Sequence, residues 1–283
     1  MAIPESQLET WSHLGAVTTA KVTADSIKNV LDSYSDLPAG IDFEVYLHGS
    51  YKNDTNIRGD SDVDVVVQLN STLCSNLSED QKRVLGKTPA SYLWSNFRVD
   101  VLKTLKDYYG QSYITEGNKS LKVKVNNGRL PADVVVSIQY RKYRSVNDYD
   151  YIEGMCFWSR NYNRQIINYP KVHYDNGVSK HQNSNKWYKP SVRMFKNIRG
   201  SIPGDSTPSY FLECMLYNVP NISFGTSYQD TFYNVVNWLN KADLDSFICQ
   251  NSQLKLFGLT PEQWDMAQAK QFIKNIISLW DGW

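Results

Sequence analysis

Two aspartates separated by a single residue are the most chemically suggestive feature of this sequence. Asp62-Val63-Asp64 opens a valine-rich run that is typical of a buried strand. Side chains two residues apart on a strand point the same way, so the two carboxylates share one face while Val63 and Val65 enter the core. Carboxylates this close repel each other, and a divalent cation removes the conflict.

A third aspartate stands in a similar setting. Asp133 opens a second valine-rich segment, residues 133–136. If the two strands are neighbours, three carboxylates converge at one edge of the sheet. Such hard oxygen ligands suit Mg²⁺, which completes its shell with water and substrate phosphates. The pattern therefore predicts Asp62, Asp64 and Asp133 as candidate metal-binding residues.

The alternative is that acidic residues at a strand end are merely solvated, and Asp-x-Asp alone does not decide between the two. An EF-hand loop is excluded, because its glycine position is Val65 and its glutamate position is Ser71. The upstream pair Gly49-Ser50 favours a phosphate site, since glycine admits close backbone approach and serine adds donors. The sequence has neither a Walker A motif nor a GxGxxG motif.

The elements around these residues form a mixed α/β pattern up to about residue 160. Apolar spacing predicts helices, alternation predicts strands, and the turn Asn126-Asn127-Gly128-Arg129 is of the hairpin type. The expected elements are a helix at 5–36, a strand at 42–48, a polar loop at 49–61, a strand at 62–69, a helix at 79–109, and strands at 119–126 and 132–140.

Beyond residue 160 the pattern becomes helical. Residues 161–186 are polar and predict a loop. The last helix is expected to start with Thr260 as its N-cap and Pro261 in its first turn. The helices expected here are 188–199, 209–219, 228–242 and 261–280.

Composition narrows the class of protein. The 283 residues carry 30 Lys and Arg against 29 Asp and Glu, a net charge of +1, which argues against a dedicated DNA-binding protein. The sequence shows no export signal and no membrane-spanning stretch. Its 4 cysteines form no CxxC pair, so we expect a cytoplasmic protein with reduced thiols.

The string at 49–64, GSYKNDTNIRGDSDVD, resembles the active-site motif of the cGAS/DncV-like nucleotidyltransferases (CD-NTases) of bacterial CBASS anti-phage defence, within the polymerase-β-like superfamily. The resemblance implies an α+β fold: a nucleotidyltransferase lobe with a mixed sheet and helices, and a C-terminal helical lobe, with a central cleft. The expected domains are 1–160, including a long N-terminal helix, and 161–283, which binds nucleotide.

The same resemblance implies the synthesis of a cyclic oligonucleotide second messenger, in the first place a cyclic dinucleotide, from nucleoside triphosphates. Two Mg²⁺ ions, or Mn²⁺ as a substitute, would assist the transfer, and pyrophosphate would leave. The resemblance makes Asp62, Asp64 and Asp133 the catalytic residues that hold these ions. Two alternatives stay open: a linear nucleotidyltransferase acting on RNA, protein or a small molecule, and a catalytically silent interaction module. The intact aspartates argue against the silent module, because clustered repelling carboxylates have no structural use.

By resemblance, a set of residues from both halves of the chain binds nucleotide. Tyr210 would stack on a base. For Lys196 the alternative is a solvated basic helix face, and for Ser209 a helix N-cap. Asn53 and Arg58 are expected to brace the loop that carries them. The predicted nucleotide-binding residues are Gly49, Ser50, Lys196, Ser209 and Tyr210, followed in rank by Asn53, Arg58 and Arg193.

The partners implied are small molecules. ATP, GTP or both are the expected substrates, with a pyrimidine triphosphate as a further option, and CBASS accessory proteins are candidate partners. We expect a monomer that binds neither membrane nor duplex DNA. The clusters Lys119-Lys122-Lys124 and Arg141-Lys142-Arg144 are interpreted as solvated strand faces in preference to an RNA-binding surface.

Overall fold

A computed structural model describes residues 2–15, 17–59, 62–125, 130–146 and 149–283. The chain divides into two compact units. The first, which we call the helical unit, consists of Met1–Gly15, Lys52–Asp60 and Val172–Trp283. The second, which we call the sheet unit, consists of Ala16–Tyr51 and Ser61–Lys171. Two N-terminal segments thus pack with the C-terminal helices. Within the described ranges, no helix has both the length and the apolar character needed to cross a membrane.

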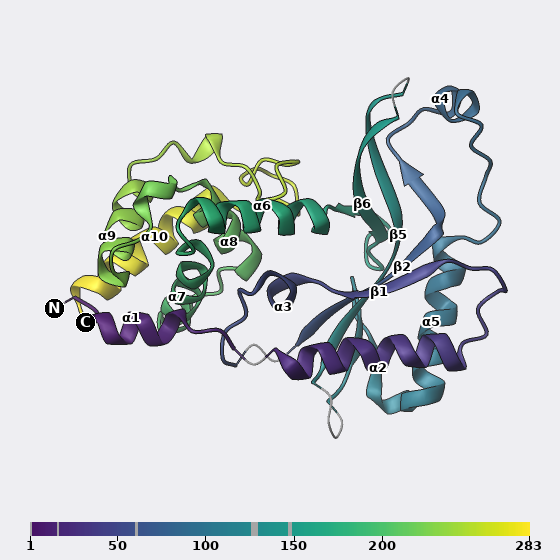
Figure 1. The fold of residues 1–283 in the computed structure, drawn as a ribbon, viewed down its shortest axis with the longest axis horizontal. Coiled ribbons are helices and arrows are strands. Elements are labelled where there is room, and N and C mark those ends of the chain that lie inside the picture. The colour runs from purple at the N-terminus through teal and green to yellow at the C-terminus, as the bar shows by residue number, and fades with distance from the viewer. Residues whose placement is uncertain (1, 16, 60–61, 126–129, 147–148) are drawn as a thin grey trace. The chain divides into compact units, whose positions relative to one another are not determined.

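A mixed seven-stranded sheet forms the framework of the sheet unit (Figure 1). Its path runs β1-β2-β5-β4-β3, with β6 added to β5 and β7 to β6. β2 and β5 are parallel, and the other pairs are antiparallel. The strands are β1 Phe43–Leu47, β2 Val63–Ser75, β3 Ile114–Glu116, β4 Leu121–Val123, β5 Ala132–Ser145, β6 Asp150–Trp158 and β7 Gln165–Asn168.

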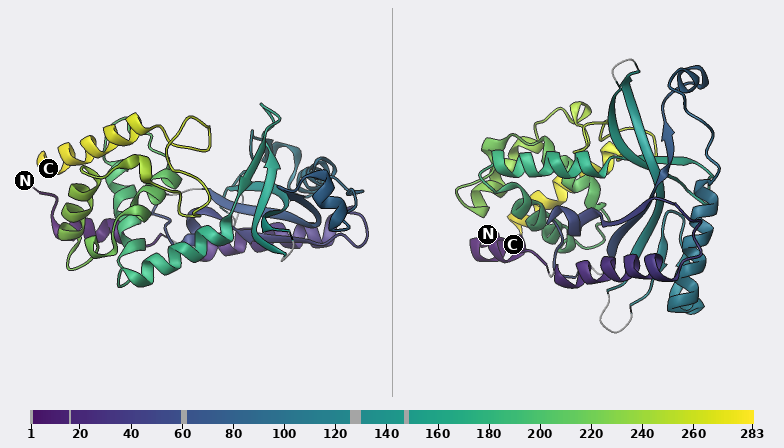
Figure 2. Two further views of the ribbon diagram at one scale, coloured as in Figure 1. Left: turned by 90° about the horizontal axis from the view of Figure 1, so that it is seen from above. Right: turned by 45° about the vertical axis from the view of Figure 1, so that its right-hand side comes forward.

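Two amphipathic helices pack against this sheet and against each other: α2 (Thr18–Tyr34) and α5 (Trp94–Tyr109). α2 buries Ile27 and Leu31, and α5 buries Phe97, Val101 and Leu105 at helical spacing. In both views of Figure 2, the purple α2 runs along the sheet. The mixed sheet with packed helices confirms the α+β class predicted from the sequence.

The sequence pattern was wrong about continuity in this unit. The helix expected at 79–109 is two helices, α4 (Glu79–Val84) and α5, because Gly86 adopts a positive φ of 64° and Pro89 follows it. The loop expected at 49–61 contains a short helix, α3 (Gly49–Asn53). The hairpin turn predicted at 126–129 lies outside the described residues.

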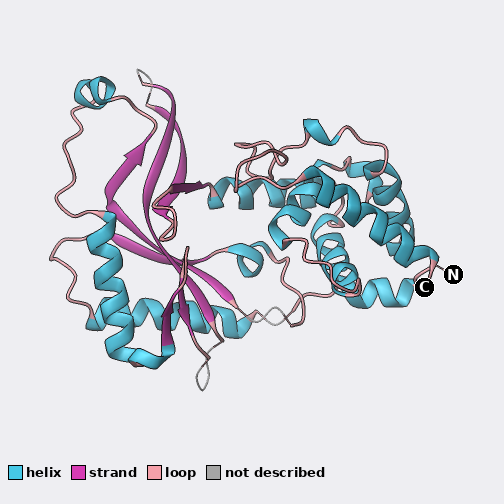
Figure 3. Ribbon diagram, turned by 180° about the vertical axis from the view of Figure 1, so that it is seen from behind, coloured by secondary structure: helices cyan, strands magenta, loops and turns pink. Residues whose placement is uncertain are grey.

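The helical unit is built on one apolar cluster of buried side chains. Figure 3 shows in cyan the helices of this unit. Phe195, Phe232 and Trp264 are among its largest buried side chains, and Phe195 stacks on Phe232 with 5.6 Å between ring centroids. The helices are α1 Glu5–Ser12, α6 Pro170–Asn183, α7 Tyr188–Gly200, α8 Ser209–Asn218, α9 Tyr228–Leu239 and α10 Met266–Asp281, of which α6 begins in the sheet unit.

The prediction that the polar segment 161–186 is a loop was wrong. The segment contains β7 and the helix α6. α6 buries only His173 and Gly177, so it shows almost no apolar periodicity in the sequence. The last helix begins at Met266 with Asp265 as its cap, and not at Thr260. Thr260 instead donates a hydrogen bond to Gln263, in a turn that precedes the helix.

The long N-terminal helix expected at 5–36 is also two helices, and they belong to different units. Gly15 explains the break. Its amide donates to the carbonyl of Asn56 at 3.2 Å, and a Cβ at this position would lie 2.8 Å from the carbonyl oxygen of Ile57. The chain must therefore leave α1 before Gly15, and α2 starts afresh at Thr18.

A carboxylate fastens α1 to α9. The two oxygens of Glu5 accept hydrogen bonds from the amides of Tyr228 and Gln229, each at 2.8 Å. These amides belong to the first turn of α9 and have no partner within that helix. The negative charge also meets the positive end of the α9 dipole.

We therefore predict that Glu5→Ala lowers the free energy of unfolding by about 1 kcal/mol. Urea denaturation followed by circular dichroism measures this. The control is Glu9→Ala, an exposed glutamate on the same helix, which should leave the midpoint unchanged. Equal midpoints for both variants would show that the Glu5 contacts contribute nothing.

Candidate functional site

The strand register brings two of the predicted aspartates together. In the parallel pair β2–β5, Asp64 lies opposite Asp133 and Val65 opposite Val134. Aligned residues of neighbouring strands project from the same face, and the strands lie about 4.8 Å apart. Val65 and Val134 are fully buried, so they hold the strands in place while the two carboxylates share the opposite face.

Gly49 lies directly against one of these carboxylates. Its φ is +61°, and a Cβ at this position would come within 2.1 Å of Oδ2 of Asp64. The neighbouring amide of His48 donates to the backbone oxygen of Asp64 at 2.8 Å. Only glycine satisfies both the left-handed conformation and the close approach. The Gly49-Ser50 turn is thus held beside Asp64.

Asp62 is exposed and precedes β2 by one residue. Within the described ranges, no three His, Cys, Asp or Glu side chains gather as a metal site. The fold therefore supplies the pair Asp64 and Asp133, and the participation of Asp62 stays a prediction. The donor set fits a hard divalent cation, because carboxylate oxygens are the ligands that such ions prefer.

A lysine extends this row of side chains. Lys122 of β4 lies opposite Asp133 in the antiparallel pair β4–β5 and is exposed. Directly opposed residues project from one face of a sheet. From the sequence, Lys122 is expected on a solvated strand face, and nothing in the pattern indicates that it lies beside Asp133. That link depends on strand order, which alternation does not reveal.

In the helical unit, the predicted basic residues are not on a solvated helix face. Lys196 is 1% exposed, and its ammonium donates to the carbonyl of Thr55 at 2.8 Å. Arg193 donates to the carbonyls of Ser12 and Asp54. Both side chains therefore fix backbone segments that lie far from α7 in the sequence.

Ser209 is not an N-cap, because α8 begins at Ser209 itself, after Pro208. Its Oγ accepts a hydrogen bond from Arg199 at 2.9 Å. The next residue, Tyr210, keeps 41% of its surface exposed. Its ring lies 5.6 Å from that of His173 at an interplanar angle of 25°. Arg58 is exposed.

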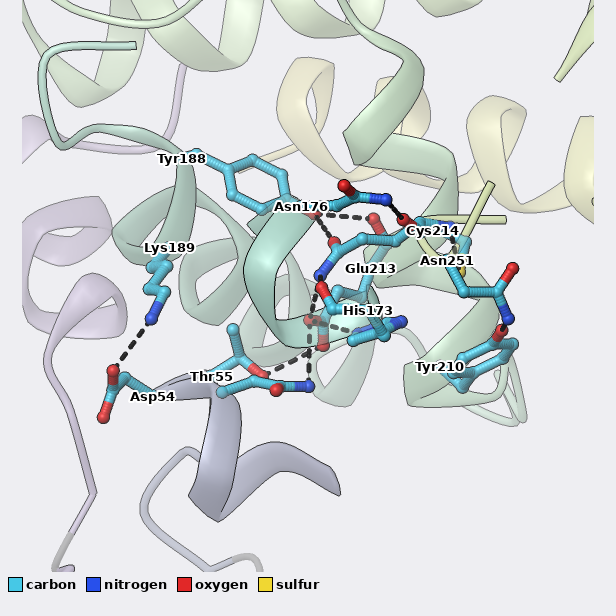
Figure 4. A network of polar contacts seen from close by, with 12 residues as sticks. Asp54, Thr55, His173, Asn176, Tyr188, Lys189, Tyr210, Glu213, Cys214 and Asn251 are labelled. Atoms are coloured by element: carbon cyan, nitrogen blue, oxygen red, sulfur yellow. Dashed lines mark hydrogen bonds and ion pairs between the residues drawn. The ribbon is translucent and has the colours of Figure 1, made fainter. Parts of the chain in front are cut away.

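A buried carboxylate that we did not predict joins several of these residues. Glu213 of α8 is 4% exposed and accepts hydrogen bonds from Thr55 at 3.0 Å and from Asn53 at 3.5 Å (Figure 4). His173 lies 3.1 Å away through Nε2. The signal in the sequence was a charged residue within the apolar stretch of α8, which must be paired when buried.

Burial alone would raise the pKa of Glu213, but the hydrogen bond and charge of His173 oppose it, together with Lys196 and the Thr55 hydroxyl. The pKa of Glu213 is therefore lowered from its ordinary value. Glu213 is a carboxylate at neutral pH, which is the form that accepts hydrogen bonds from all of these donors.

Two family models match the chain. Residues 27–142 match the nucleotidyltransferase domain, and residues 175–281 match the cGAS/DncV-like nucleotidyltransferase C-terminal helical domain. Enzymes of the nucleotidyltransferase family generally use divalent metal ions. The two matches confirm the resemblance seen at residues 49–64.

Curated relatives match over the full length. A cyclic UMP-AMP synthase of Rhodothermus marinus is 55% identical, covering 100% of this chain and 99% of the relative. The cyclic nucleotide synthase CdnE01 of Staphylococcus haemolyticus is 38% identical, covering 100% of both.

Solved structures give the same result. The R. marinus CdnE c-UMP-AMP synthase with Apcpp and Upnpp superimposes with a TM-score of 0.93 at 54% identity, covering 99% of this chain and 97% of that one. The Elizabethkingia meningoseptica CdnE cyclic dinucleotide synthase with GTP and Apcpp has a TM-score of 0.78 at 26% identity, covering 98% of both. This chain therefore belongs to the cGAS/DncV-like nucleotidyltransferases.

Proposed function

We propose that this enzyme joins UTP and ATP into the cyclic dinucleotide cyclic UMP-AMP. The choice of bases rests on the 55% identity to a cyclic UMP-AMP synthase over the whole chain. The transfer chemistry rests on one observation, the pairing of Asp64 with Asp133 on parallel strands. Linear transfer and a silent interaction module are not favoured, because full-length relatives are cyclic nucleotide synthases.

The reaction consists of two transfers. In the first, a ribose hydroxyl oxygen of one triphosphate attacks the α-phosphorus of the other, and the bond to pyrophosphate breaks while the hydroxyl proton is lost to solvent. In the second, the linear intermediate presents its own ribose hydroxyl to its remaining α-phosphorus, and a second pyrophosphate leaves. Catalysis of this kind is mainly positioning and electrostatic stabilisation.

Asp64 and Asp133, joined by Asp62, supply the carboxylate oxygens that would hold two Mg²⁺ ions, or Mn²⁺ in their place. When bound, these ions would neutralise phosphate charge and acidify the acceptor hydroxyl. The contact with Gly49 limits where the Asp64 carboxylate can move. Ser50 adds a hydroxyl and an amide that donate to phosphate oxygens.

Tyr210 and Ser209 are the residues of the helical unit that we assign to nucleotide. The exposed ring of Tyr210 offers a surface on which a base can stack. Lys196 and Arg193 already donate to the backbone of residues 54–55. We assign these two, with Asn53, to holding that segment, and we expect Arg58 to brace the loop that carries it.

The cyclic product would act as a second messenger in CBASS anti-phage defence. A synthase that draws on nucleoside triphosphates works in the cytoplasm, where they are made. We propose that it acts as a monomer and that CBASS accessory proteins are its partners. The proposal is tested first on the isolated enzyme, because the reaction needs only triphosphates and a divalent cation.

Incubation with labelled UTP and ATP and Mg²⁺, followed by phosphatase treatment, should leave a resistant product with the mass of cyclic UMP-AMP. A cyclic compound has no terminal phosphate for the phosphatase to remove, which is why it survives. Omitting either triphosphate should abolish this product. A product that phosphatase degrades completely would reject cyclisation, and one made from ATP alone would reject the assignment of bases.

Asp133→Asn should lower turnover by about a hundredfold or more, since it removes a charge that the transition state needs. The melting temperature should stay equal or rise, because the repulsion with Asp64 is relieved. Asp107→Asn, at an exposed position of α5, is the control and should match the wild type in both measurements. A variant that melts far lower would instead mark Asp133 as structural.

Gly49→Ala should abolish most turnover, because the new methyl group overlaps the Asp64 carboxylate. Gly40→Ala is a matched control, since Gly40 also has a positive φ, of 80°, but its Cβ would meet open space. The control should lose about 1 kcal/mol of stability and keep its turnover. Equal turnover in both variants would mean that the approach of Gly49 to Asp64 has no catalytic role.

A further inference from the structure

The ring of Tyr210 does not stand alone on the surface of the helical unit. Beneath it lies the imidazole of His173, stacked at 5.6 Å and 25°. Tyr210 is 41% exposed, whereas the side chain of His173 is only 8% exposed. The two rings therefore form a layer with one buried and one accessible member.

The orientation of the buried ring depends on Glu213. Nε2 of His173 lies 3.1 Å from the Glu213 carboxylate, while its buried Nδ1 has no hydrogen-bond partner among the described residues. A carboxylate accepts and cannot donate, so the proton of the pair lies on Nε2. One hydrogen bond thus sets the rotation of the imidazole, and the imidazole sets the surface on which Tyr210 rests.

The backbone of α6 at His173 is fixed by a second residue of the same network. Gln250 donates through Nε2 to the carbonyl of His173 at 2.8 Å, and Tyr188 donates its hydroxyl to Gln250 at 2.5 Å. Gly177, one turn further along α6, leaves room for the same amide, since a Cβ there would lie 2.5 Å from it. The helix is thereby held through its backbone as well as through the ring, and Gln250 also donates to Glu213 at 3.5 Å.

Glu213 also reaches a second segment of the unit. It accepts hydrogen bonds from Asn53 and Thr55, the second of which is labelled in Figure 4. Both donors follow the Gly49-Ser50 pair along the chain. Lys189 and Lys196 fix the same segment through Asp54 and the Thr55 carbonyl. A single buried carboxylate therefore supports both the layer of rings and the segment 53–55.

We infer that Glu213 and His173 are positioning residues for nucleobase binding: Glu213 orients His173, and His173 holds the ring of Tyr210 in the plane that a nucleobase stacks on. The inference rests on the proposed role of Tyr210 in base stacking, and it explains what holds the Tyr210 ring in its plane. A ring that is held before the ligand arrives loses little conformational entropy on binding. Asn251 also donates to the hydroxyl of Tyr210 at 3.5 Å, so the stack on His173 supports the face of a ring whose tip is held separately.

The test separates the hydrogen bond from the stack. His173→Phe keeps an aromatic ring beneath Tyr210 and loses the bond to Glu213, whereas Glu213→Gln keeps the shape of the carboxylate and loses its charge. Phe247→Leu is the structural control, because it removes another stack, with Trp238 at 5.5 Å, outside this network. For each variant we would measure the melting temperature, the affinity for UTP and for ATP by calorimetry, and kcat and KM.

His173→Phe and Glu213→Gln should weaken the binding of one of the two triphosphates about tenfold and raise its KM, while kcat per folded molecule changes little. Phe247→Leu should lower the melting temperature and leave both affinities unchanged. Variants of His173 and Glu213 that behave like this control would overturn the inference, since they would then be structural only.

A double-mutant cycle with Tyr210→Ala provides the second test. If His173 acts through Tyr210, the loss of affinity in the double variant should equal that of Tyr210→Ala alone. Losses that multiply would overturn the inference. Because calorimetry measures binding without turnover, a wild type that binds triphosphates but forms no cyclic product would refute the proposed function and leave this test intact.

Discussion

The register of the parallel strands β2 and β5, which sets two carboxylates side by side, is the constraint on which the sheet unit depends. Parallel pairing of β2 with β5 sets Asp64 beside Asp133, and buried valines on the other face keep the strands from slipping. A slip by one residue would turn the aspartates into the core. Carboxylates that share one face of neighbouring strands repel each other unless a cation lies between them, which is why we propose a cation site here.

The helical unit also contains a carboxylate in a costly position, but here the protein itself supplies the groups that stabilise its charge. Glu213 is buried with its charge, and protein donors from three separate segments satisfy it: Asn53 and Thr55, His173, and Gln250. Removing one member of such a network leaves a buried charge without its partners, so the network holds its segments in one arrangement. Here that arrangement includes the stacked rings of His173 and Tyr210. The position of the accessible Tyr210 ring therefore depends on the buried residues His173 and Glu213.

Part of the carboxylate site could be predicted from the sequence, because strand alternation and residue chemistry are local: they place Asp62 and Asp64 on one face and Asp133 at the start of a second strand. The pairing of Asp64 with Asp133 depended on the two strands being neighbours, and the register of β2 with β5 supplies that. The contacts that Lys196 and Glu213 make with residue 55 could not be predicted, since they depend on which distant segment each side chain meets. Helix α6 was missed because its buried side chains are few and make polar contacts, so its sequence lacks the apolar period of a helix.

The central claim is that Asp64 and Asp133 together bind a divalent cation. Electron paramagnetic resonance of Mn²⁺ bound in the presence of a non-hydrolysable nucleoside triphosphate tests it without turnover. The account predicts Mn²⁺ binding to the wild type that is weakened at least about tenfold in both Asp64→Asn and Asp133→Asn. Equal Mn²⁺ affinity in the wild type and both variants would contradict it.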